Sequence, residues 1–98
     1  MFNKKVYELT LRIFDEVIEE LVKKSEEFHN YATMLDTHGE DIEIEAKCMI
    51  RGKANKYMEA SNYLKRQEIK YMENMMKILE KENADLREVI NKNGESNN

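Results

Sequence analysis

The chain has 98 residues, 37% of them charged, with no proline and one cysteine. This length fits one domain, and a single cysteine excludes an internal disulfide framework. Abundant charge without proline is typical of long exposed helices. Because two helices bury little surface and small domains are marginally stable, we expect a third helix, a second copy or another partner to complete the fold.

The first predicted element is a helix over about residues 3–35, with Asn3 as its N-cap. Apolar residues recur every seven positions, with a second row four residues further on, which predicts a helix packed along one seam. The ladder is Tyr7, Phe14, Leu21, Phe28 and Leu35, and the second row is Leu11, Ile18, Ser25 and Ala32. Further apolar residues widen this face and predict contact with more than one neighbour. They are Val6, Leu9, Ile13 and Val17.

Residues 36–41 predict a turn in which Gly39 takes the left-handed conformation that ends helices. A second helix follows over about residues 42–91. Gly52 disfavours helix there by about 1 kcal/mol relative to alanine, but the apolar stripe keeps its phase across it. This favours one long helix over a three-helix alternative that breaks at Gly52. The polar residues 93–98 predict a disordered tail, so residues 1–92 form a single hairpin domain.

A second seven-residue ladder mirrors the first about Gly39 and consists of Ile50, Tyr57, Leu64, Tyr71 and Ile78. Two seams in mirrored order predict an all-α fold, an antiparallel helical hairpin. In the predicted register, the numbers of facing residues sum to about 78. The expected pairs are Phe28 with Ile50, Leu21 with Tyr57, Phe14 with Leu64, and Tyr7 with Tyr71.

The second helix is longer than the first, so residues beyond about 74 lack a partner within the chain. This overhang stays apolar on one side, and residues 79–87 have the pattern of a short coiled coil. An apolar stripe without a partner predicts self-association as a dimer or larger homo-oligomer. The residues expected to mediate it are Met72, Met75, Leu79, Leu86, Val89 and Ile90.

Charge is distributed unevenly along the chain. Residues 1–46 have a net charge of −7, residues 47–70 have +5, and the whole chain has −4. One interpretation is that an acidic first helix complements a basic second helix and sets their antiparallel pairing. The other is a basic face that binds nucleic acid or a nucleotide phosphate. Its residues are Lys53, Lys56, Tyr63, Lys65, Arg66 and Lys70.

Signals for metal or catalytic chemistry are weak. Glu26 and His29 form the Glu-x-x-His step that di-iron bundles use twice, but the only other histidine is His38, in the predicted turn. We therefore expect no metal, no cofactor and no enzymatic activity. Cys48 is expected to have a packing role, because cysteine is among the most buried residue types.

Two glutamates, Glu68 and Glu82, fall inside the apolar stripe of the second helix. Each is expected to pair with a basic residue or to specify register, as polar residues in helical cores do.

These observations predict a non-enzymatic protein-interaction module that self-associates and binds another macromolecule as an inhibitor, adaptor or assembly factor. A chain with one cysteine and without an apolar signal core or ~20-residue apolar span fits the cytoplasm. Small size and abundant lysine and asparagine suit an accessory protein of a phage or mobile element. The alternative function is a helical oligomer that binds nucleic acid or sequesters a small nucleotide through the basic face.

Overall fold

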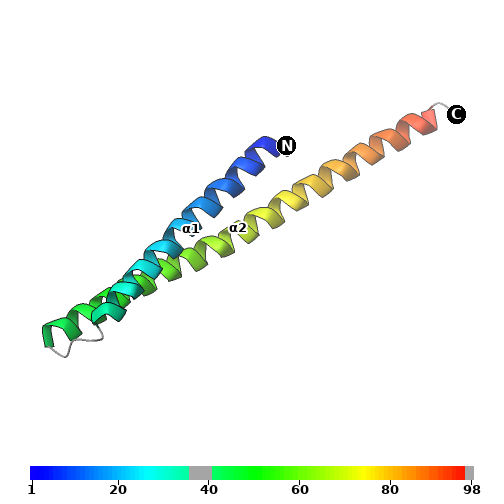
Figure 1. Cartoon of the computed structure of the whole chain (residues 1–98). Helices are drawn as coiled ribbons and strands as arrows, with labels where there is room; N and C mark the ends of the chain where they lie inside the picture. Colours follow the sequence, from blue (N-terminus) through cyan, green and yellow to red (C-terminus); the bar gives the residue numbers. More distant parts are fainter. Residues whose placement is uncertain (36–40, 97–98) are drawn as a thin grey trace.

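The protein is an antiparallel hairpin of two helices, α1 (Lys4–Leu35) and α2 (Asp41–Ser96), in a computed structural model that describes residues 1–35 and 41–96 (Figure 1). The molecule is 88 Å long and 17 by 15 Å across. The described residues contain no strand, which confirms the predicted all-α hairpin. The predicted turn residue Gly39 lies outside the described residues.

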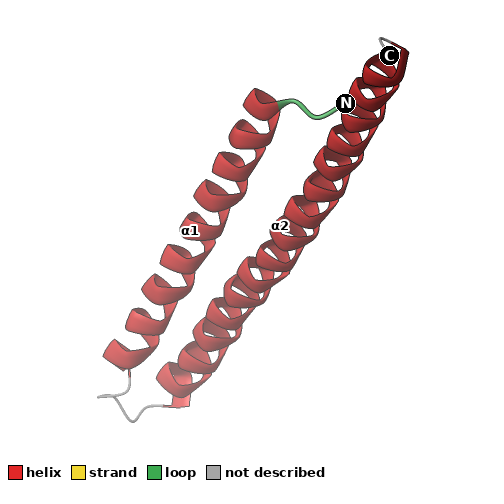
Figure 2. Ribbon diagram, turned by 90° about the vertical axis from the view of Figure 1, so that its right-hand side faces the viewer, coloured by secondary structure: helices red, strands yellow, loops and turns green. Residues whose placement is uncertain are grey.

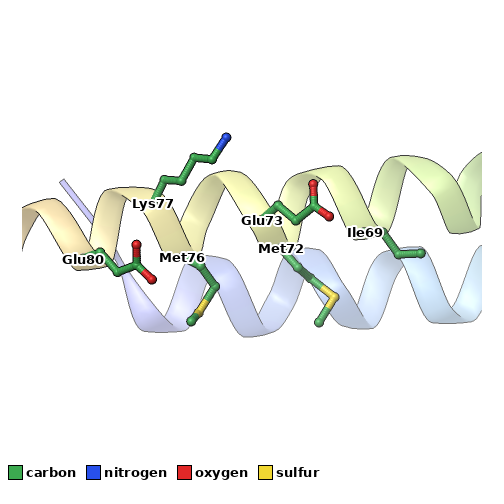
Figure 3. A pocket seen from close by; sticks show the side chains of 6 residues that line it. All are labelled: Ile69, Met72, Glu73, Met76, Lys77 and Glu80. Carbon is green, nitrogen blue, oxygen red and sulfur yellow. The ribbon is translucent and has the colours of Figure 1, made fainter.

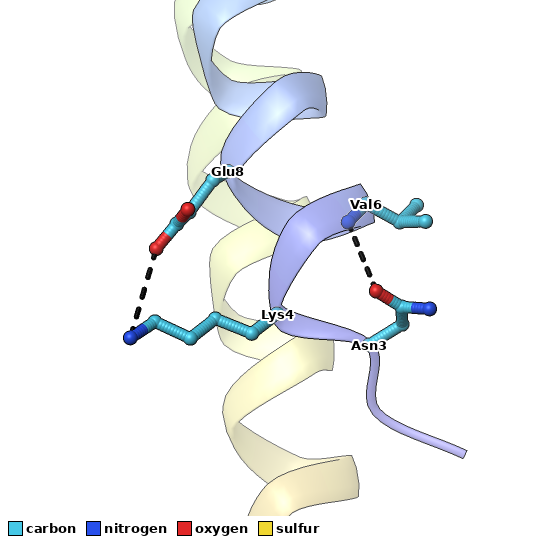
Figure 4. Close-up of polar contacts among 4 residues, drawn as sticks. All are labelled: Asn3, Lys4, Val6 and Glu8. Carbon is cyan, nitrogen blue, oxygen red and sulfur yellow. Dashed lines mark hydrogen bonds and ion pairs between the residues drawn. The ribbon is translucent and has the colours of Figure 1, made fainter.

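Helix α1 begins at the predicted N-cap. The side-chain oxygen Oδ1 of Asn3 accepts a hydrogen bond from the backbone N–H of Val6 at 3.1 Å (Figure 4). The backbone carbonyl of Asn3 accepts the N–H of Tyr7 at 3.0 Å. Asn3 therefore satisfies amide groups that the first turn of a helix leaves without a partner, and the N-cap prediction is confirmed.

Helix α2 runs without interruption through Gly52, so the three-helix alternative is wrong. A Cβ added at Gly52 would meet nothing within 4 Å, so packing does not require a glycine there. The helix also continues to Ser96, five residues past its predicted end. Residues 93–96 are thus helical rather than part of a disordered tail, because this segment contains no proline and Gly94 does not take a positive φ. Residues 97–98 lie outside the described residues.

The centre of the seam between the helices is built from small residues. Ser25, Ala32, Ala54 and Ser61 are each no more than 1% exposed. The hydroxyl Oγ of Ser25 donates a hydrogen bond to the backbone carbonyl of Ala54 at 2.9 Å. A side chain as short as serine reaches the facing backbone only where two helices lie close together, so small side chains set the helix separation here.

Aromatic rings fix the register of the hairpin. Tyr7 stacks on Tyr71 with ring centroids 5.8 Å apart, as predicted, but Tyr71 also contacts Phe14 at 6.2 Å. Tyr57, predicted opposite Leu21, instead stacks on Phe28 at 5.6 Å. Facing residue numbers therefore sum to between 78 and 85 rather than to 78. The reason is that a bulky ring packs between two residues of the opposite ladder instead of on top of one.

The N-terminus extends the hairpin beyond its predicted limit. Residues 1–3 run from α1 to α2 (Figure 2), and the N–H of Phe2 donates a hydrogen bond to Oε1 of Glu82 at 2.6 Å. Met75 and Leu79 are half-buried. The prediction that α2 lacks an intrachain partner beyond about residue 74 is therefore wrong for residues 75–82. The overhang consists of residues 83–96.

Candidate interaction surfaces

The two glutamates of the seam have different environments, and neither contacts a basic residue in the way the sequence predicts. Glu82 is half-buried and accepts the amide of Phe2. Glu68 lies beside Asp15, and its Oε2 is buried without a hydrogen-bond partner among the described residues. Burial of Glu68, together with the neighbouring Asp15 carboxyl group, raises the pKa of Glu68 above its ordinary value. The seam therefore contains one poorly accommodated acidic group.

The candidate metal and thiol residues are all on the surface. Glu26 and His29 are exposed on α1, and residues 1–35 and 41–96 contain no cluster of three or more His, Cys, Asp or Glu side chains placed to hold a metal ion. Cys48 is a free, exposed cysteine. The predicted packing role of Cys48 is wrong, because position 48 falls on the side of α2 turned away from α1.

An exposed apolar surface lies along one side of α2. Ile69, Met72 and Met76 are 55%, 39% and 52% exposed. They line a shallow groove of about 460 Å³, which Glu73, Lys77 and Glu80 border (Figure 3). Figure 3 shows Met72 and Met76 pointing to the same side of the helix and Lys77 pointing away from them.

This groove is the beginning of a longer line, which we call the lateral face. Its residues are Ile69, Met72, Met76, Leu79, Asn83, Leu86 and Ile90, spaced alternately by three and four positions. Because α2 is unbroken, this spacing keeps all seven on one side of the helix. The side is turned by roughly 60–100° from the seam residue Met75. Leu86 and Ile90 are both 59% exposed, so the lateral face continues onto the overhang.

The residues predicted for self-association divide between three places. Met72, Leu79, Leu86 and Ile90 lie on the lateral face. Met75 belongs to the seam, seven residues from both Glu68 and Glu82. Val89 lines a groove of about 500 Å³ where the N-terminus meets α2, together with Met1, Phe2, Glu82, Asp85 and the lateral-face residue Leu86.

Three lateral-face residues, Ile69, Met76 and Asn83, lie outside the predicted self-association set. The signal for them is present in the sequence as the alternating three- and four-residue spacing that continues to Ile90. It is obscured because the seam occupies the adjacent side of the same helix, so that two apolar stripes overlap in the pattern.

A second exposed apolar strip lies on the first half of α1. It consists of Val6, Leu9, Ile13 and Val17, the residues that widen the apolar face of this helix. Ile13 and Val17 line a small groove of about 180 Å³ with Thr10, Phe14 and Leu64. The strip therefore borders the seam but is not covered by it.

The basic residues of α2 do not form one face. Lys56, Tyr63 and Lys70 are exposed at seven-residue intervals, and Arg66 lies between the last two on the same side. Lys65 points to the opposite side from Tyr63, because two residues turn an α-helix by roughly 200°. The Nζ of Lys53 lies 5.5 Å from the centre of the Phe28 ring, within cation–π range. Lys53 therefore contributes to the hairpin itself.

Comparisons with known proteins add no identification. No family model matches this chain, and neither curated proteins nor solved structures include a significant match. Within the described part of the chain, no helix has the length and apolarity needed to cross a bilayer.

Proposed function

We propose that this protein is a non-enzymatic interaction module that self-associates and binds another macromolecule as an inhibitor, adaptor or assembly factor. The observation that supports the proposal is the lateral face, a line of mainly apolar side chains from Ile69 to Ile90 that α1 leaves largely uncovered. Extended exposed apolar surfaces on small proteins are characteristic of interaction sites.

The overhang gives a thermodynamic reason for self-association. Residues 83–96 form a helical segment that extends past α1 (Figure 1), and Met1 and Phe2 line a groove with its residues Asp85, Leu86 and Val89. Helices shorter than ~12–15 residues are marginal in water, and helices in proteins owe most of their stability to packing of an apolar face. A partner that covers Leu86 and Ile90 would supply that packing.

A separate surface supports the binding of a further macromolecule. The α1 strip of Val6, Leu9, Ile13 and Val17 lies on a different helix from the lateral face. A chain with two distinct apolar surfaces can associate with its own copy through one and with a different partner through the other. This arrangement suits a small cytoplasmic adaptor or inhibitor, such as an accessory protein of a phage or mobile element.

Multi-angle light scattering of the full chain tests the proposal. We expect the wild type at tens of micromolar to have at least twice the chain mass of 11.7 kDa. Leu86→Glu combined with Ile90→Glu should give the monomer mass, because charge placed in an apolar interface is costly. The matched control is Ala84→Glu with Asn91→Glu, which adds the same charge on the opposite side of α2 and should remain associated. A wild-type monomer would contradict the proposal.

A second candidate function is the binding of nucleic acid or a nucleotide through α2. Its support is the exposed line of Lys56, Tyr63, Arg66 and Lys70, in which cations flank an aromatic ring that can stack on a base. Fluorescence anisotropy with a short labelled single-stranded oligonucleotide tests it. Binding should weaken steeply with salt and be lost in Lys56→Glu with Lys70→Glu. Absence of binding by the wild type at low salt would exclude this function.

A further inference from the structure

We infer that the lateral face binds a second copy of this chain in parallel orientation and in register, with the two copies of Asn83 facing each other. The inference rests on the proposed self-association and specifies its partner, its residues and its geometry.

The first argument is the spacing of the lateral face. Residues alternating by three and four positions occupy the a and d positions of a heptad repeat. The a positions are Ile69, Met76, Asn83 and Ile90, and the d positions are Met72, Leu79 and Leu86. They extend over three heptads, about 32 Å of helix at 1.5 Å per residue. A face of this kind is complementary to a copy of itself, because each a or d side chain of one helix fits into the space between four residues of the facing helix.

The second argument is the single polar residue in this line. Asn83 is exposed within the lateral face, between Leu79 and Leu86. A lone asparagine at an a position specifies register and a two-stranded state in parallel coiled coils. In that arrangement, two Asn83 side chains face each other, and each amide has both donors and an acceptor. In an antiparallel pair, Asn83 would oppose a leucine and bury its amide unpaired, which is unfavourable.

The third argument is one complementary pair of charges beside the overhang; two heptads earlier, the same register sets Glu68 against Glu73. Glu82 and Arg87 occupy g and e positions of successive heptads. In a parallel pair, the g residue of one helix lies near the e residue of the following heptad in the other helix. The carboxylate of Glu82, whose Oε1 accepts the Phe2 amide, can then pair with Arg87 through its other oxygen, twice across the interface. In an antiparallel pair centred on this segment, the two Glu82 carboxylates would instead lie on the same side and repel each other.

The position of α1 leaves room for this interface. The lateral face is turned by roughly 60–100° from the seam. The N-terminal segment approaches α2 at Glu82 and at the groove that Met1 and Phe2 line with Asp85, Leu86 and Val89. A two-fold axis between parallel α2 helices would place the two α1 helices on opposite sides of the pair. The overhangs would then meet along Asn83, Leu86 and Ile90 without obstruction by either α1.

Disulfide trapping tests orientation and register in the full chain. In a Cys48→Ser background, Met72→Cys and Leu86→Cys are made separately and equilibrated in glutathione buffer. In a parallel, in-register dimer each position faces its own copy, so each variant should form a disulfide-linked dimer. Asn74→Cys is the control, because position 74 points away from the lateral face, and it should not crosslink.

The outcomes separate this inference from the proposed function. If the variants sediment as dimers but form a crosslink only when Met72→Cys is mixed with an Ile90→Cys variant, the pair is antiparallel, because d residues then face a residues. That result would overturn the inference and leave self-association intact. If the wild type and the reduced cysteine variants all sediment as monomers at tens of micromolar, both the proposed self-association and the parallel-dimer inference are overturned.

Asn83→Leu provides a second test that does not depend on crosslinking. Replacing a polar residue in the interface should tighten association by about tenfold and permit species larger than a dimer, because the residue that specifies the two-stranded state is gone. Asn74→Leu is the matched control and should leave the dissociation constant unchanged. An unchanged dissociation constant for Asn83→Leu would place Asn83 outside the interface and contradict the inference.

Discussion

Two parts of the same helix, α2, are stabilised in different ways. Between Ala46 and Glu82 it packs against α1, and its buried positions include Ala54 and Ser61, both fully buried. Beyond Glu82 it carries larger apolar side chains, Leu86, Val89 and Ile90, all more than half exposed. Within α2, the deepest burial thus belongs to its smallest seam residues. Close approach of the two backbones explains the first part, whereas we propose that in the second a partner covers the larger side chains.

The largest expected effect comes from enlarging a small residue of the seam. Ala54→Leu places three extra carbons where the Ser25 hydroxyl contacts the Ala54 carbonyl at 2.9 Å. Overpacking of this kind typically costs about 1–3 kcal/mol and sometimes more. Urea unfolding followed by circular dichroism should register this loss. Ala84→Leu, the same change at an exposed position of the overhang, should alter stability by less than about 0.5 kcal/mol. Equal effects at both positions would contradict the contrast between the two parts of α2.

A smaller effect is expected from Glu68→Gln, and it should depend on pH. The folded protein raises the pKa of Glu68, so the folded state binds this proton more tightly than the unfolded state. Well below the ordinary carboxyl pKa, both states are protonated and Glu68 imposes no penalty. As pH rises through the folded pKa, the penalty becomes complete. Glu68→Gln should therefore stabilise the hairpin at pH 7 but not at low pH.

Thermal melts across this pH range measure the effect of Glu68→Gln. Glu73→Gln, the same substitution at an exposed position of α2, is made in parallel for comparison. A variant Glu68→Gln whose stability parallels the wild type at every pH would show that the Glu68 carboxyl group is well accommodated in the seam.

The smallest effects should come from the two buried serines, and they should have opposite signs. Ser25→Ala removes the hydrogen bond to the Ala54 carbonyl and should lower the free energy of unfolding by about 0.5–1.5 kcal/mol. Ser61→Ala removes a buried hydroxyl that has no hydrogen-bond partner among the described residues, so it should be neutral or slightly stabilising. Chemical denaturation of both variants makes this comparison. Equal losses would indicate that the Ser61 hydroxyl is hydrogen-bonded in solution.

The sequence is sufficient to predict which sides of the helices meet. The ladders that contain Tyr7 and Tyr71 identify the seam, and the unchanged phase across Gly52 predicts one continuous α2. The exact register is harder to predict, because a seven-residue repeat determines a face but leaves the offset between two faces open by up to a heptad. Interdigitation of whole rings, such as Phe28 with Tyr57, decides that offset, and it depends on three-dimensional packing.

Other features also depend on three-dimensional packing, and for that reason they could not be predicted from the sequence. The contact between Phe2 and Glu82 joins residues 80 positions apart and depends on the final register. The spacing of the lateral-face residues is visible in the sequence. The seam lies on the adjacent side of α2, however, so the apolar residues of this helix form one broad pattern in which the two faces are hard to separate. The charge asymmetry suggested pairing between helices, yet Glu19 pairs with Lys23 on its own helix, and Lys53 contacts a ring.

Amide hydrogen exchange at two protein concentrations tests most directly whether the overhang is stabilised by a second copy. At high concentration, which favours the proposed dimer, we expect protection of amides 83–94 to increase, because packing along Leu86 and Ile90 would stabilise this segment. Amides between Ala46 and Met75 should change much less, since α1 covers them in the monomer as well. Protection of residues 83–94 that is the same at concentrations from nanomolar to hundreds of micromolar would contradict the account.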